Sequence, residues 1–101
     1  MDLAVLEPET DTRAKTRLAP QWKVILHNDD VTTFEFVIEL LRTLFKKSQI
    51  ESVRLTYEVH EKGLAIVAIT NFEHAELYCD QVKSLARARS FPLVATMEPA
   101  D

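Results

Sequence analysis

The sequence predicts an α+β domain with the element order β-α-α-β-α-β, in which three helices pack on one face of a three-stranded antiparallel sheet. Apolar runs typical of strands occur at residues 22–27, 64–70 and 92–98, and the intervening segments carry apolar residues at helical spacing. Two helices between the first two strands reverse the chain, whereas a single crossover helix makes the third strand parallel to the second. If the first strand lies between the other two, every neighbouring pair is antiparallel, which is a split β-α-β arrangement.

The first half of the domain begins at a strand, WKVILH (22–27), which the turn-forming residues NDDVTT end. Thr32 and Glu35 have the spacing of a capping box and predict the start of the first helix. A stripe of apolar residues follows at intervals of three and four, formed by Phe34, Val37, Ile38, Leu41, Leu44 and Phe45.

Ser48 and Glu51 form a second capping box, which predicts the start of the second helix. We expect Gly63 to end this helix in a left-handed conformation. Its expected apolar face comprises Ile50, Val53 and Tyr57, with Leu55 and Val59 beside them.

The continuous apolar run LAIVAIT (64–70) predicts a buried strand, and Thr70 with Glu73 suggests a third capping box. The third helix carries an apolar stripe of Ala75, Tyr78, Cys79, Val82, Leu85 and Ala86. The last strand, PLVATME (92–98), begins with a proline, which restricts that residue to an edge or a first position.

Composition indicates one domain of 21–101 preceded by a flexible tail of 1–20, which mixes prolines, threonines and charges without a sustained period. The net charge of −4 argues against broad, phosphate-driven binding of nucleic acid. A single glycine, Gly63, excludes a glycine-rich nucleotide fingerprint, and a single cysteine, Cys79, excludes a multi-cysteine zinc site. No apolar run is long enough to span a membrane, so we expect a soluble cytoplasmic protein. We expect neither a cofactor nor a metal.

Candidate chemistry concentrates in residues 27–32, HNDDVT, at the junction of strand and helix. These polar residues fit an ordinary capped turn, and they also fit a cluster of acceptors for a cation or an amine. His60 ends the second helix, so a helical hairpin would return it beside Asn28 and Asp30. A metal site of His27, His60 and Asp30 is a weaker alternative, because no two of these ligands are spaced on one element.

Four segments together resemble the ClpS adaptor family over about residues 22–98: KVILHNDDVTTFEFVIELL, V-H-x-x-G-x-A-I-V, E-x-A-E and PLVATME. The resemblance implies a ClpS-like fold and a protein that is not an enzyme. Such an adaptor binds proteins with destabilising, bulky hydrophobic N-terminal residues (Leu and Phe, also Tyr and Trp). It delivers them to a Clp AAA+ unfoldase and its protease for degradation.

The resemblance also assigns roles to residues. It implies that the substrate α-amine is bound by Asn28, Asp30 and His60, and that Asp29 lies near the substrate backbone. An α-ammonium is mostly charged at pH 7 and has three donors, which a carboxylate, an amide oxygen and a neutral imidazole satisfy. The implied side-chain pocket is formed by Thr32, Val37, Val59 and Leu93, together with Phe34 and Thr56. Docking on the unfoldase is assigned to Glu73, Glu76 and Tyr78.

Phe34 and Thr56 occupy positions where the family commonly has methionine, and Tyr78 one where a basic residue is common. Phenylalanine is stiffer than methionine and narrows a pocket entrance, whereas threonine removes bulk. We therefore expect Leu to be accepted best and Phe next, with Tyr and Trp weakened and the β-branched Ile and Val excluded.

The expected partners are substrates with N-terminal degrons and the N-domain of a ClpA- or ClpC-type unfoldase, bound by a monomer. No nucleic acid or membrane partner is expected. A bacterial cytoplasm is the expected location, or a plastid stroma for a mature organellar form. Two alternative hypotheses remain. One is a docking module similar to the C-terminal domain of the ribosomal stalk protein, without an amine pocket. The other is a small hydrolase using Asp30 and His60. The hydrolase lacks a candidate nucleophile.

Overall fold

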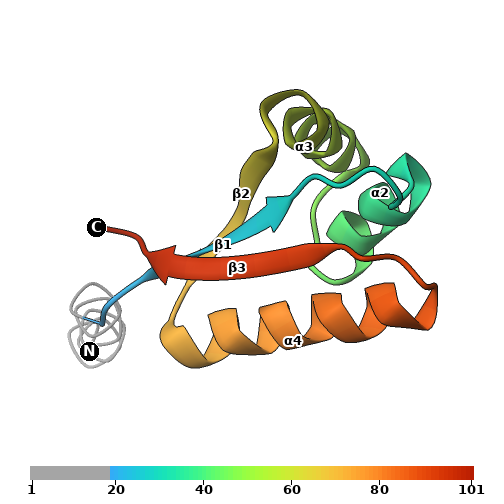
Figure 1. Ribbon diagram of the computed structural model, residues 1–101. Coiled ribbons are helices and arrows are strands. Elements are labelled where there is room, and N and C mark those ends of the chain that lie inside the picture. The colour runs from blue at the N-terminus through green and yellow to red at the C-terminus, as the bar shows by residue number, and fades with distance from the viewer. Residues whose placement is uncertain (1–18) are drawn as a thin grey trace, which may run out of the picture.

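The computed structural model describes residues 19–101, so the expected tail lies outside the described residues except for Ala19 and Pro20. The elements follow the predicted order (Figure 1): β1 (Trp22–His27), α2 (Phe34–Thr43), α3 (Gln49–Lys62), β2 (Leu64–Thr70), α4 (Phe72–Ala88) and β3 (Val94–Pro99). The predicted α+β fold class is confirmed, and the first two strands have the predicted bounds. No helix among the described residues is both long and apolar enough to cross a membrane.

The sheet has the strand order β2-β1-β3, and both pairings are antiparallel. The central strand, β1, therefore pairs with both edge strands, as the split β-α-β topology requires. Beyond the end of β1, the backbone N–H of Asn28 donates to the carbonyl of Gly63 at 2.9 Å. This bond holds the turn after β1 beside the end of α3, two places far apart in the sequence.

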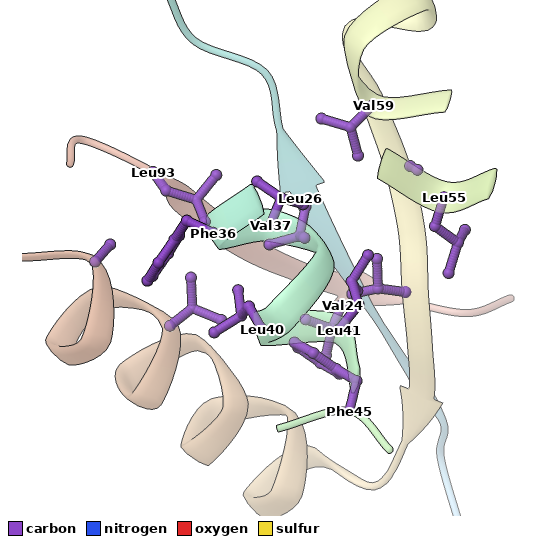
Figure 2. Close-up of a cluster of buried hydrophobic side chains, with 14 of the residues drawn as sticks. Val24, Leu26, Phe36, Val37, Leu40, Leu41, Phe45, Leu55, Val59 and Leu93 are labelled. Atoms are coloured by element: carbon purple, nitrogen blue, oxygen red, sulfur yellow. The ribbon is translucent and has the colours of Figure 1, made fainter. Parts of the chain in front are cut away.

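The hydrophobic core lies between one face of the sheet and the helices (Figure 2). Val24 and Leu26 of the central strand and Ala65 and Val67 of β2 are buried there. The alternate residues Leu64 and Ile66 are exposed on the opposite face, and Ile69 joins them there because the pairing with β1 shifts register between Val24 and Ile25. The expectation of a buried strand at 64–70 is thus correct for one face only, because the helices cover a single side of the sheet.

Two of the three predicted capping boxes begin one residue too early. The N-cap of α2 is Thr33, whose hydroxyl accepts the N–H of Phe36 at 3.2 Å, because the Thr32 side chain is bonded to Asp29 instead. The N-cap of α4 is Asn71, because Thr70 still pairs with Trp22 in the sheet. Ser48 caps α3 as predicted.

Gly63 also ends α3 as predicted. Its φ is 90°, in the left-handed region, and its N–H donates to the carbonyl of Val59 at 2.9 Å. A residue with a side chain would be strained at this φ.

The buried face of α3 differs from the predicted one. Ile50 is 83% exposed and Tyr57 is also exposed, while the buried residues are Ser52, Leu55, Thr56 and Val59. Two hydroxyl-bearing residues therefore take part in the face that packs against the domain. Leu85, expected in the apolar stripe of α4, is likewise exposed. Apolar periodicity identifies these helices, but the neighbouring elements decide which side is covered.

Candidate functional site

All ten residues that the sequence analysis assigned to the amine site, the substrate backbone and the side-chain pocket line one cavity of about 280 Å³. They come from the turn after β1, the start of α2, the last turns of α3 and the segment before β3. The lining residues are Asn28, Asp29, Asp30, Thr32, Phe34, Val37, Thr56, Val59, His60 and Leu93. The fold thus brings together the two sequence segments that carry the candidate chemistry.

Polarity changes from the mouth of the cavity to its floor. Asn28, Asp30 and His60 are exposed, so they form the mouth. The floor is buried and mostly apolar, formed by Val37, Thr56, Val59 and Leu93. None of the ion pairs among residues 19–101 involves Asp30, so its charge is available to a ligand. The mouth can therefore accept a cationic donor, and the floor can take an apolar group.

Asp29 organises the turn at the rim of the cavity. Its Oδ1 accepts the N–H groups of Val31 at 2.8 Å and Thr32 at 2.7 Å, and its Oδ2 accepts the Thr32 hydroxyl at 2.8 Å. Partial burial on its own would raise the pKa of Asp29. The hydrogen bonds from Thr32 and Val31, together with the positive charge of Arg87, outweigh burial and lower the pKa. The capped-turn interpretation therefore holds for Asp29, while Asn28 and Asp30 face the cavity on either side of it.

Replacing Asp29 with alanine should lower the free energy of unfolding by about 1–2 kcal/mol at pH 7, because it removes the acceptor of the turn. A carboxylate with a lowered pKa stabilises the fold above its ordinary value of about 3.9, and the contribution is lost as the pH falls through the lowered value. Urea unfolding of wild type and Asp29→Ala should show a difference that is constant above about pH 5 and shrinks below about pH 4. A difference that grows at acid pH would contradict this role.

Phe34 is held at the rim by two aromatic contacts. Its ring lies edge-on to Tyr57, with centroids 5.2 Å apart, and to His60, with centroids 5.1 Å apart. Such edge-to-face pairs fix the orientation of a ring. Tyr57 is predicted on the apolar face of the second helix. It is exposed, does not line the cavity and contacts the Phe34 ring instead.

Arg87 lies near the site, although neither the sequence pattern nor the resemblance assigns it there. Its Nη1 donates to the carbonyls of Phe91 at 2.7 Å and Leu93 at 3.1 Å. These bonds attach the segment that contains Leu93, a residue of the cavity floor, to the C-terminal end of α4. The two acceptors lie only four and six residues after Arg87, but no capping motif in the sequence predicts side-chain bonds across this turn.

The three residues assigned to docking lie on the N-terminal half of α4, and none lines the cavity. Glu73 and Glu76 are exposed. Tyr78 is half-buried, because its ring stacks on Phe45, with centroids 4.4 Å apart, and on His74, with centroids 4.3 Å apart.

The metal alternative of His27, His60 and Asp30 does not converge. The Nε2 of His27 lies 2.7 Å from Thr96 Oγ1, in a hydrogen bond with the neighbouring strand, and His27 does not line the cavity. Within residues 19–101, no three histidine, cysteine or acidic side chains are placed to hold a metal ion.

Comparison with known proteins identifies the family. Residues 17–96 match the family model described as ATP-dependent Clp protease adaptor protein ClpS. The ClpS adapter protein of Desulfatibacillum aliphaticivorans is 41% identical over 90 residues, which cover 89% of this chain and 86% of that protein. The ClpS adapter protein of Clostridium acetobutylicum is 43% identical over 76 residues, which cover 75% of each chain.

A solved structure is similar as well. Agrobacterium tumefaciens ClpS2 bound to L-phenylalaninamide superimposes with a TM-score of 0.77 and 34% sequence identity. The match covers 79% of this chain and 96% of that one. Fold, sequence and family model agree: the chain belongs to the ClpS family, the non-catalytic adaptor proteins of the ATP-dependent Clp protease.

Proposed function

We propose that this protein binds the free N-terminus of proteins that begin with a bulky hydrophobic residue and delivers them to a Clp AAA+ unfoldase. One observation carries the proposal: Asn28, Asp30 and His60 stand at the exposed mouth of a cavity whose floor is buried and mostly apolar. In a free N-terminus, the charged α-amino group and the first side chain are attached to the same α-carbon. The cavity offers a partner for each of these two groups.

The mouth suits an α-ammonium better than an internal amide. Asp30 supplies the opposite charge, and the Asn28 oxygen and a neutral His60 nitrogen supply two further acceptors. An internal peptide group has a single N–H and no charge, so it leaves most of these acceptors without a partner. This difference makes the chain terminus, rather than the residue type alone, the recognised feature.

The floor accounts for the preference for an apolar side chain. Val37, Val59 and Leu93 offer contact without a hydrogen bond, which favours leucine and aromatic residues. L-phenylalaninamide, the ligand of the Agrobacterium structure, has a free α-amino group and a benzyl side chain. This is the combination of groups that we assign to the ligand of the present cavity.

A pair of peptides tests the proposal. Fluorescence titration with a labelled peptide that begins with Leu should give saturable binding, and its N-acetylated twin should bind at least about thirty-fold more weakly. Acetylation removes the charge and two donors while leaving the side chain unchanged. Equal affinity of the two peptides would refute recognition of the amine.

Delivery requires a second surface, and we assign it to Glu73, Glu76 and Tyr78 on α4. These residues lie outside the cavity, so a bound substrate leaves them accessible to an unfoldase N-domain of the ClpA or ClpC type. The cytoplasm, where such unfoldases act on soluble substrates, is the location that this role implies.

The N-terminal segment should matter for delivery and not for substrate binding. Residues 1–17 carry no sustained apolar period, and their deletion keeps every described residue that lines the cavity or forms the core. We therefore expect the affinity for a Leu peptide and the thermal midpoint to stay nearly unchanged. Degradation of a Leu-tagged substrate by the unfoldase and protease should fail, because we expect this segment to engage the unfoldase. Full degradation with the truncated protein would contradict that division of roles.

A further inference from the structure

The buried face of α3 contains two hydroxyl groups that the apolar floor does not require. Thr56 lines the cavity and is 2% exposed, and Ser52 is 0% exposed. Thr56 Oγ1 donates to the carbonyl of Ser52 at 2.7 Å, so its hydrogen is already used while its oxygen can still accept. Ser52 Oγ has no hydrogen-bond partner within the described part of the chain.

The two hydroxyl groups continue a row that starts at the mouth of the cavity. His60, Thr56 and Ser52 follow one another at intervals of four residues, so they lie on the same face of α3 in successive turns. Exposure falls along this row from His60 at the mouth to Ser52 in the interior. The cavity therefore deepens toward Thr56, with Ser52 one turn beyond it.

A buried polar group without a partner weakens a fold, and apolar residues of similar size would avoid that cost. A ligand that brings a hydrogen-bond donor to the floor would find the Thr56 oxygen as an acceptor, with the Ser52 hydroxyl behind it. Leucine and phenylalanine side chains have no donor. The phenol group of tyrosine has one at the far end of its ring, opposite the α-carbon.

We infer, on the basis of the proposed function, that Thr56 forms a polar subsite for a phenol hydroxyl. This subsite makes N-terminal tyrosine a preferred ligand over phenylalanine. The phenol donates to Thr56 Oγ1, which lines the cavity, while Ser52 lies one helical turn deeper and does not line it. For tyrosine alone, this reverses the order expected from the narrowing effect of Phe34.

Three peptides that differ only at the first side chain test the inference on the full-length protein. The peptide with N-terminal Tyr should bind about three- to ten-fold more tightly than its Phe twin, as expected for one buried hydrogen bond. A peptide with N-terminal 4-fluorophenylalanine should bind like the Phe peptide, because fluorine adds size at the same position without a donor. Affinity of the Tyr peptide equal to or below that of the Phe peptide would overturn the inference.

Variants locate the acceptor through the ratio of Tyr to Phe affinity, which cancels a general loss of binding. Thr56→Val keeps the shape of the side chain and should bring the ratio to one or below, whereas Thr56→Ser keeps the hydroxyl and should preserve it. Thr43→Val is the matched control, since Thr43 makes the same type of bond, to the Glu39 carbonyl at 2.8 Å, on the exposed side of α2. An unchanged ratio in Thr56→Val would refute the subsite.

The same titrations separate this inference from the proposed function. If free-amine Leu and Phe peptides both fail to bind, the proposed function is wrong. If they bind and lose affinity on acetylation, but tyrosine has no advantage, only the polar subsite is wrong. The peptide series on wild type decides the inference even if Thr56→Val does not fold.

Discussion

Asp30→Ala should weaken the binding of a free-amine Leu peptide by tens to hundreds of fold, which corresponds to about 2–4 kcal/mol. The Asp30 carboxylate is exposed without ligand, and a bound N-terminus would cover it while placing an ammonium against it. Losing the carboxylate then leaves a cation in a partly desolvated mouth with only neutral acceptors. Isothermal titration calorimetry with the Leu peptide measures the change directly.

Asp30→Asn separates charge from hydrogen bonding at this position. The amide retains an acceptor oxygen but no charge, so its affinity should fall between those of wild type and Asp30→Ala. His60→Ala should also reduce affinity strongly, because it removes an acceptor and one of the two rings against Phe34. Asp80→Ala, an exposed aspartate of α4 outside the cavity, is the control and should bind like wild type. Undiminished binding by Asp30→Ala would rule out the carboxylate as the partner of the amine.

Leu41→Ala should lower the free energy of unfolding by about 2–5 kcal/mol, a large part of the stability of a domain of this size. Leu41 is 0% exposed and belongs to the core between α2 and the sheet, so truncation loses buried apolar area and leaves a cavity (Figure 2). Chemical denaturation monitored through Trp22 fluorescence gives the difference.

Leu77→Ala is the matched control for the core substitution. Leu77 lies on α4 and is 50% exposed, so the same change in chemistry should alter stability by less than about 1 kcal/mol. Similar losses in the two variants would mean that Leu41 is not the core residue described here.

Several local features could be predicted because they depend on residues close in the sequence. Gly63 ends α3 as expected, since a left-handed φ of 90° is a local requirement that glycine meets without strain. The bounds of β1 and β2 follow from apolar runs between turn-forming residues. The N-caps of α2 and α4 lie one residue after the predicted ones. Thr32 is hydrogen-bonded in the turn and Thr70 is paired in the sheet, and the capping pattern does not take such partners into account.

The grouping of the site residues came from resemblance together with topology. Asp30 and His60 share no local motif, and only the return of the helical hairpin brings them to one cavity. The hydrogen bond from the Asn28 N–H to the Gly63 carbonyl holds the end of α3 beside the turn after β1. Because both groups belong to the backbone, the side chains at these positions do not predict the bond. The family motifs therefore identified these residues as one site. Composition and periodicity could not establish that the residues lie close together.

By itself the sequence determined the order and type of the elements, the glycine at the end of α3 and the polar cluster between β1 and α2, because helical period, strand runs and turn chemistry act over a few residues. Only the tertiary structure decided which face of each element is covered. It buries Ser52 and Thr56 while leaving Ile50 and Leu85 exposed, and it leaves one face of the sheet open. The reason is physical: burial depends on which neighbour a surface meets, and that neighbour comes from a distant part of the chain.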